Sequence, residues 1–331
     1  MPAAKHPSGR LIGLLLLLSL TGFGAALAIG SAPIPLAEVL RILAGAGDEP
    51  QRSIVLALRL PRALSAFAVG ALLAVSGALL QVLLRNPLAD PYVLGTSGGA
   101  AVGALLAMLA GLSGAWLNGG AFLGALLATV LVFGLARRDG DWAPARLLLT
   151  GIILAAGWGA SIAFILTIAP EHNLRGMLFW LMGDLVTGEV PWPALALLLV
   201  VLSVGLALAR PLNVLARGEL QAQTLGVAVV PLRATLYLLA ALGTAGAVTL
   251  AGSVGFVGLI VPHLLRLAGA RDQRILLPAC ALGGGALLIA ADLLARTLWA
   301  PQQLPVGILT AGIGIPVFLF LLLRSHADVR A

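Results

Sequence analysis

The sequence contains little charge and almost no lysine. Only 10% of its 331 residues are Asp, Glu, Lys or Arg, and its single lysine, Lys5, lies close to the N-terminus. A P-loop needs a lysine that reaches the phosphates of the bound nucleotide. Because Lys5 lies in a terminal tail, the chain is expected not to hydrolyse ATP.

Cysteine and histidine are also scarce. The only cysteine is Cys280, which excludes an intrachain disulfide, and its apolar neighbours predict a packing role. The four histidines are far apart and show no spacing typical of a metal site: His6, His172, His263 and His326. We therefore expect no catalytic cluster, no bound metal and no cofactor on this chain.

Apolar residues dominate what is present. They make up 60% of the chain, whose mean hydropathy is +1.06, and a membrane span needs about 20 of them in a row. Eight windows contain no Asp, Glu, Lys or Arg; two are too long for one span, and these break at Gly111–Gly114 and at Gly252–Ser253. The sequence predicts an all-α, polytopic membrane protein with about ten transmembrane helices, in which residues 1–331 form one domain.

The basic residues predict the orientation. If the N-terminus is cytoplasmic, fourteen of the twenty Lys and Arg residues lie on the inside, so the positive-inside bias favours ten spans with both termini in the cytoplasm. The first apolar run, Leu11 to Gly30, has the length of a span rather than of a signal-peptide core. A net charge of +7 then needs no nucleic acid to explain it.

The acidic residues fall at the predicted span ends or in loops. A proton- or ion-driven transporter would normally bury carboxylates in the middle of its helices. The pattern favours a passive pathway that a partner protein powers, although a self-sufficient facilitator or secondary transporter would have a similar composition.

The first informative segment joins an outer arginine pair to a proline-bounded turn. Arg59-Leu60-Pro61-Arg62 precedes an apolar helix, which leads to Asn86-Pro87-Leu88-Ala89-Asp90-Pro91. The prolines predict a tight cytoplasmic turn or a gate. Glycines then recur every four residues, at Gly95, Gly99 and Gly103, which indicates close helix packing.

The second segment is the long polar stretch from Arg210 to Arg233, which is predicted to be cytoplasmic. Within it, residues 217–226 favour a short helix that begins after Gly218 and ends at Gly226. A short helix on the membrane surface is suited to docking into a groove of a partner protein.

Two further segments lie towards the C-terminus. Gly252 to Arg266 contains GSVGFVGLIVPHLLR, whose glycines and proline predict a broken or short helix. Further on, Asp292 and Arg296 are four residues apart and are expected to pair along one helix face. Leu304-Pro305-Val306-Gly307-Ile308-Leu309-Thr310 follows.

In this order, these segments resemble the FecCD-like permease subunits of type II ABC importers, a group that includes vitamin B12, haem and ferric siderophore permeases. The resemblance extends from about Arg59 to Leu323 through RLPR, NPLADP, GFVGLIVPH and LPVGILT. It implies a BtuC-like fold in a bacterial inner membrane and a homodimer with its pathway on the two-fold axis. It also implies two ATP-binding cassette subunits, which bind ATP and Mg, below the membrane and a periplasmic substrate-binding protein above it.

The resemblance also assigns roles to individual residues. Arg59, Arg62 and Arg296 would meet acidic residues of the binding protein at the outer surface, where charge complementarity aids orientation; snorkelling helix ends are the alternative. The coupling segment, about 213–227, would dock on the ATPase through Arg217, Gly218, Glu219, Leu220, Ala222, Leu225 and Gly226. The gate and pathway would include Asn86, Leu88, Gly95, Ser97 and Gly98. Some members of the family carry hydroxyl residues just before the fifth span, where this sequence has Pro144 and Ala145, so no polar gate is expected there.

One segment concerns the cargo. Residues 174–184 are predicted near the outer mouth, and Met177, Phe179, Trp180 and Met182 would suit contact with a flat macrocycle or, alternatively, an interfacial aromatic belt. The sequence favours a tetrapyrrole, haem or cobalamin, over a siderophore. His172 is a weak candidate for contact with iron.

Overall fold

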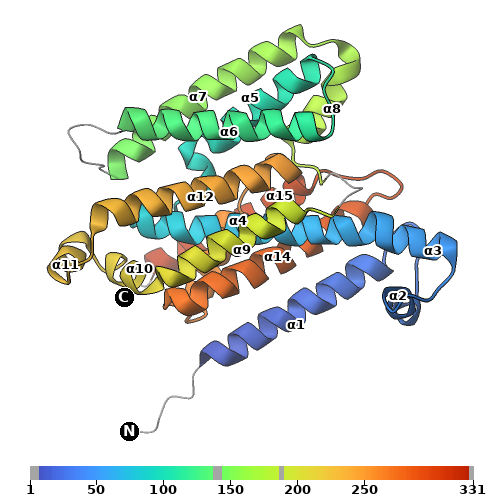
Figure 1. Cartoon of the computed structure of the whole chain (residues 1–331), viewed down its shortest axis with the longest axis horizontal. Coiled ribbons are helices and arrows are strands. Elements are labelled where there is room, and N and C mark those ends of the chain that lie inside the picture. Colours follow the sequence, from blue (N-terminus) through green and yellow to red (C-terminus); the bar gives the residue numbers. More distant parts are fainter. Residues whose placement is uncertain (1–6, 137–143, 186–189, 328–331) are drawn as a thin grey trace.

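The computed structural model describes residues 7–136, 144–185 and 190–327, and these ranges contain helices and no strands (Figure 1). Four basic residues used to predict the orientation, Lys5, Arg137, Arg138 and Arg330, lie outside them. The elements are α1 (Pro7–Ala28), α2 (Leu36–Leu43), α3 (Glu49–Ser53), the π-helix η1 (Ile54–Arg59), α4 (Leu60–Leu83), the 3-10 helix η2 (Pro91–Leu94), α5 (Thr96–Leu109), α6 (Ala115–Ala136), α7 (Pro144–Ile168), α8 (Glu171–Leu181), α9 (Trp192–Ala207), α10 (Ala209–Leu215), α11 (Glu219–Thr224), α12 (Val229–Ala251), α13 (Val257–Leu267), α14 (Gln273–Thr297) and α15 (Val306–Ala327).

Six helical stretches in the described residues are long and apolar enough to cross a membrane: α1, the continuous stretch of α3, η1 and α4, then α6, α7, α12 and α14. A seventh candidate is the pair α9 and α10, which bend by 65° at their junction. The shorter apolar helices are α5, α13 and α15. These units follow the apolar segments of the sequence one by one, and the number that cross the membrane stays a prediction.

Both predicted helix breaks are confirmed. The first separates α5 from α6, and the glycines on either side of it, Gly111 and Gly114, have positive φ angles of 70° and 57°. The second follows α12, where Gly252 has a φ of 63°. Residues with side chains rarely adopt this backbone conformation, so glycine allows each helix to stop sharply.

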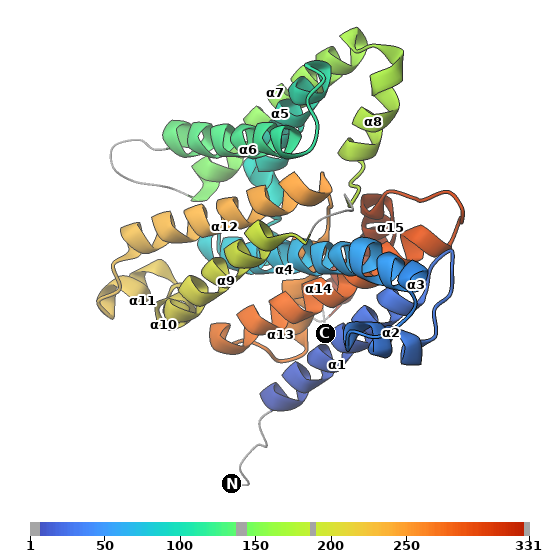
Figure 2. The ribbon, with the colours of Figure 1, turned by 45° about the vertical axis from the view of Figure 1, so that its right-hand side comes forward.

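The helix α4 forms the centre of the bundle. It is flanked by α9, α12, α13 and α14, while α5, α6 and α7 lie together on one side and α1 packs against α14 on the other (Figures 1 and 2). The end of the bundle that carries α2 and α3 is called the α3 end below, and the opposite end, from which α11 projects, is called the α11 end.

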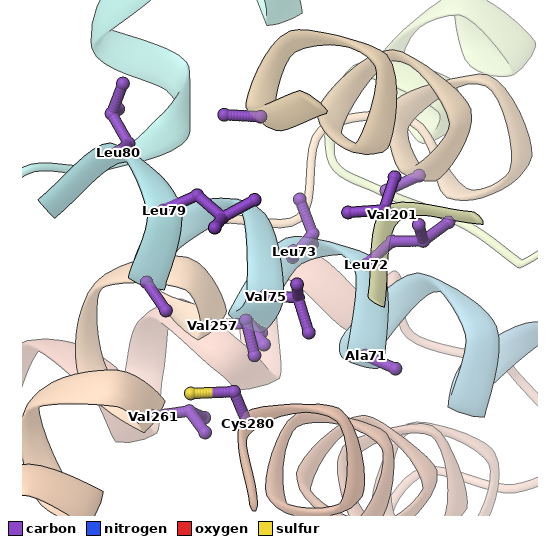
Figure 3. Close-up of a cluster of buried hydrophobic side chains, with 14 of the residues drawn as sticks. Ala71, Leu72, Leu73, Val75, Leu79, Leu80, Val201, Val257, Val261 and Cys280 are labelled. Atoms are coloured by element: carbon purple, nitrogen blue, oxygen red, sulfur yellow. The ribbon is translucent and has the colours of Figure 1, made fainter. Parts of the chain in front are cut away.

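Side chains of α4, α9, α13 and α14 pack together at the centre of the bundle (Figure 3). Leu72, Leu73 and Leu79 of α4 are fully buried among residues of α9, α13 and α14. Cys280 of α14 lies in this apolar cluster beside Val261, with no exposed surface. The packing role predicted for the only thiol is therefore confirmed.

Candidate functional site

The short helix predicted between Gly218 and Gly226 is present at the α11 end, whereas its coupling role stays a prediction. Gly218, with a φ of 148°, precedes α11, and Gly226, with a φ of 77°, follows it. Ala222 is buried against the bundle, whereas Leu220 and Leu225 are 74% and 71% exposed. Arg217 is exposed as well. A helix of only six residues thus presents Leu220 outwards, and Leu225, which directly follows the helix, is exposed as well.

One ion pair fastens α11 to the bundle. Both Glu219 carboxylate oxygens accept hydrogen bonds from Arg233 of α12, at 2.9 and 2.6 Å. Arg233 is buried, while the Glu219 side chain is 33% exposed. Glu219 therefore anchors α11 from within, a role that the sequence did not reveal because its partner lies fourteen residues further along the chain.

The proline-bounded turn lies at the same end, after α4. Asn86 and Leu88 are exposed, and the Asn86 side-chain oxygen accepts the Leu88 backbone N–H at 2.9 Å, which is an Asx turn. Asp90 begins η2 by accepting the Tyr92 backbone N–H at 2.8 Å. Burial raises the pKa of Asp90 to about 6, against the effect of that hydrogen bond. The predicted tight turn is confirmed, whereas its function as a gate stays a prediction.

The small residues after this turn pack against neighbouring backbone. Methyl groups at Gly99 and Gly103 would overlap the carbonyl oxygens of Gly124 and Gly120 in α6, so close packing of α5 on α6 is confirmed. Gly95 does not belong to this stripe, because it precedes α5 with a φ of 72°. The four-residue spacing predicted that Gly95 shares a helix face with Gly99 and Gly103. That prediction is wrong for Gly95, since α5 begins only at Thr96.

The remaining predicted pathway residues contact other segments of the same chain. Ser97 of α5 shares a hydrogen bond with Ser253, in the break before α13, at 3.1 Å. A side chain at Gly98 would meet Trp158 of α7, and Gly95 also lies beside that indole. These three residues therefore meet where α5, α7 and the break before α13 come together.

The three arginines assigned to partner docking gather at the α3 end, where Arg59 and Arg62 are buried and Arg296 is half-buried. Arg59 and Arg62 are only 6% and 7% exposed. Arg59 donates to the carbonyls of Leu27 and Ala28, at 2.7 and 3.0 Å, and to that of Ala32. The last carbonyls of a helix lack partners within that helix, so the end of α1 attracts a guanidinium group; the Ala28 oxygen also accepts the Ile34 backbone N–H at 3.0 Å.

The other two arginines share one carboxylate. Arg62 pairs with Asp292 at 2.9 Å and donates to Gln303 at 3.0 Å, while Arg296 lies 3.1 Å from the second Asp292 oxygen. The predicted pairing of Asp292 with Arg296 is confirmed. Asp292 lies near the end of α14, as expected for the acidic residues, but the sequence did not reveal that it is buried in the bundle, where it is 1% exposed. It is stable there because two cations compensate its charge.

The aromatic segment proposed for cargo contact is mostly turned inwards. Met177 and Trp180 of α8 are buried in a cluster with α5 and α12. They are therefore not available to a cargo. The sequence could not distinguish the two roles, because large apolar and aromatic side chains suit both a packed core and contact with a macrocycle. Arg175 lies over the Phe179 ring at 5.7 Å, and His172 is exposed.

A bundle of consecutive apolar helices, each long enough or nearly long enough to span a bilayer, is the architecture of a multi-pass membrane protein. Residues 14–324 match the FecCD transport family, and the chain belongs to that family. The hemin transport system permease protein HmuU of Yersinia pestis is 43% identical over 289 residues, which cover 82% of this chain and 84% of the relative. The vitamin B12 import system permease protein BtuC of Citrobacter koseri is 41% identical over 275 residues, which cover 81% and 82%. The family predicted from the motifs is therefore confirmed.

Solved structures agree with this assignment. An inward-facing conformation of a metal-chelate type ABC transporter matches with a TM-score of 0.85 and 32% identity, over 96% of this chain and 99% of that chain. PsaBC from Streptococcus pneumoniae, at 18% identity and a TM-score of 0.53, shares the fold alone. The chain thus has the fold of a transport subunit.

Proposed function

We propose that this chain is the membrane-spanning subunit of an ATP-driven importer for a metal chelate. Two copies form a homodimer in the inner membrane with both termini in the cytoplasm. Two ATP-binding cassette subunits bind and hydrolyse ATP with Mg at the α11 end, and a periplasmic binding protein delivers the chelate at the α3 end. The chain itself is not an enzyme.

The observation that carries this proposal is the construction of α11. A six-residue helix is too short to be stable alone, yet α11 is held by a bidentate ion pair, and Leu220 in it and Leu225 directly after it are exposed. Exposed apolar side chains on a fixed helix fit a groove in a partner protein. A facilitator that works alone has no use for such a feature.

The exposed face of α7 supports a pathway between two copies. Only 11% of the apolar window of α7 is buried within the chain. Small exposed residues follow one another there: Ala155, Ala156, Gly157, Gly159 and Ala160. A smooth face of this kind binds a large chelate weakly, so that the cargo is not trapped.

The relatives favour a tetrapyrrole cargo. The names of two relatives that are 41–43% identical refer to vitamin B12 and hemin. We therefore expect haem or cobalamin rather than a ferric siderophore. With Met177 and Trp180 buried, the contacts that select the chelate lie elsewhere, and the exposed face of α7 is the first candidate.

Reconstitution tests the proposal. In proteoliposomes, the chain together with its ATPase and binding protein should import haem or cobalamin only when ATP is supplied, and the chain alone should import neither. A Leu220→Glu/Leu225→Glu variant should lower ATPase affinity and ATP-dependent import by about tenfold or more, since it removes two apolar anchors. Leu112→Glu, which changes an exposed leucine near the other end, is the matched control.

Two results would contradict the proposal. Flux of the chelates through the isolated chain would favour a self-sufficient facilitator. Unchanged ATPase binding in the Leu220→Glu/Leu225→Glu variant would show that α11 is not the coupling surface.

A further inference from the structure

The proline in α13 leaves a backbone carbonyl without its usual partner. Pro262 lies inside α13, and proline has no N–H to donate to the carbonyl four residues earlier, that of Gly258. Gly258 is buried in the bundle. A buried carbonyl without a hydrogen bond is destabilising, so another donor is needed at this point.

Helices α4 and α13 are in backbone contact at this carbonyl. A methyl group at Gly77 of α4 would overlap the Gly258 oxygen, and one at Gly258 would meet Pro91, at the start of η2. Gln81 is one helical turn beyond Gly77 and so shares its face of α4. The close approach allowed by the two glycines brings the Gln81 side chain within reach of α13.

The Gln81 side chain supplies the missing donor. Its amide nitrogen lies 3.5 Å from the Gly258 oxygen and 3.3 Å from that of Leu259. The same nitrogen lies 3.3 Å from the carbonyl oxygen of Ala89, in the proline-bounded turn. An amide group has two N–H donors, which suffice to join α13 and the turn at once.

The side-chain oxygen of Gln81 is hydrogen-bonded as well. The Gln81 side-chain oxygen accepts a hydrogen bond from Arg266, at the end of α13. Gln81 is buried, so its bonds are shielded from water and their loss is costly. One glutamine thus connects α4, both ends of α13 and the turn that contains Asn86 and Leu88.

We propose that Gln81 is a positioning residue that makes the turn at residues 86–90 and α13 move as one rigid unit. This inference rests on the proposed importer function, because the turn is the candidate gate. When the ATPase moves the α11 end, displacement of α13 is transmitted to the turn through the Gln81 amide. Without the amide nitrogen, the turn moves independently and ATP hydrolysis is poorly coupled to import.

Two variants distinguish the contribution of the Gln81 amide nitrogen from that of its side-chain oxygen. Gln81→Glu keeps an oxygen for Arg266 but loses the donors to the carbonyls, whereas Gln81→Met loses both. In the complete complex, both should lower the amount of chelate imported per ATP by about tenfold, the loss expected from about one net hydrogen bond. Gln302→Met, at an exposed glutamine near the α3 end, is the control and should leave the ratio unchanged.

A distance measurement on the purified chain tests the rigid unit without relying on transport. Spin labels are placed at Leu88→Cys and Leu267→Cys, both exposed, in a Cys280→Ala background. The unaltered Gln81 should give one narrow distance distribution, and both Gln81 variants should give a broad one. Circular dichroism and gel filtration confirm that each variant is folded before its distances are compared.

The outcomes are distinguishable. A narrow distribution in both variants, or a broad one with Gln81 present, would overturn the positioning role even if the chain is an importer. A narrow distribution in Gln81→Glu and a broad one in Gln81→Met would assign the link to Arg266 instead and would also overturn it. Failure of import with Gln81 intact, combined with the expected distances, would refute the transport function alone.

Discussion

Removal of the Glu219 carboxylate should loosen α11 while leaving the rest of the bundle folded. In Glu219→Ala, the Arg233 guanidinium loses both hydrogen bonds, at 2.9 and 2.6 Å, and stays inside the protein with its side chain 5% exposed. Breaking a fully buried pair costs about 3–5 kcal/mol. Because Glu219 is 33% exposed, water compensates in part, and we expect about 1–3 kcal/mol.

This loss of free energy affects the local opening of α11 rather than the unfolding of the whole bundle. Since α11 has only six residues and one buried side chain, Ala222, its own hydrogen bonds cannot keep it folded. A loss of about 1–3 kcal/mol raises the open fraction of residues 217–226 by about 5- to 150-fold. Hydrogen exchange of peptides from this segment should accelerate by that factor, while peptides from α4 and α14 should not change.

The controls use the same helix and the same pair. Gln223→Ala, at an exposed position of α11, should exchange like the unaltered chain. A Glu219→Leu/Arg233→Leu variant should recover most of the protection, because apolar replacement of a buried pair is often neutral. Equal exchange in Glu219→Ala and Gln223→Ala would refute the anchoring role of this ion pair.

Three further predictions concern the rest of the chain. Asp292→Asn should destabilise the bundle by about 3–5 kcal/mol in a detergent unfolding titration, because the buried Arg62 and the half-buried Arg296 lose their shared anion. Asp184→Asn, whose carboxylate is 42% exposed and 3.9 Å from Arg62, should cost under about 1 kcal/mol. The raised pKa of Asp90 means that its stabilising contribution is present below its ordinary pKa of 3.8 and is lost as the pH rises through about 6. Asp90→Asn keeps an acceptor but does not titrate, so the fall in melting temperature across that pH range should disappear. Gly103→Leu should overlap the α6 backbone and cost about 1–3 kcal/mol or more in the same titration, whereas Gly134→Leu, which meets open space, should be tolerated.

The sequence predicted the helices well because the rule behind them is simple. Within a membrane every backbone polar group must be satisfied locally, so long apolar runs form helices, and the breaks after α5 and α12 follow from their glycines. Other local features had no such signal. The π-helix η1 lies inside an apolar run, and the 65° bend between α9 and α10 falls just before the stretch from Arg210 to Arg233 that was predicted to be cytoplasmic.

The site was predicted in position more successfully than in detail. The motifs placed the arginines at one end and the short helix at the other, as the structure does. Burial was missed because it depends on partners distant in sequence: Arg62 pairs with Asp292, 230 residues away, and Gln81 reaches Gly258, 177 residues away. Such pairs become visible only once the helices are packed.

The enclosure of α4 has a practical consequence for engineering this permease. Its apolar window is 89% buried, so this helix presents almost no surface to lipid or to a passing molecule. Attempts to alter cargo choice should therefore leave α4 intact and diversify the open face of α7 instead. For the same reason α4 is a suitable internal reference for probes attached to the outer helices α6 and α7.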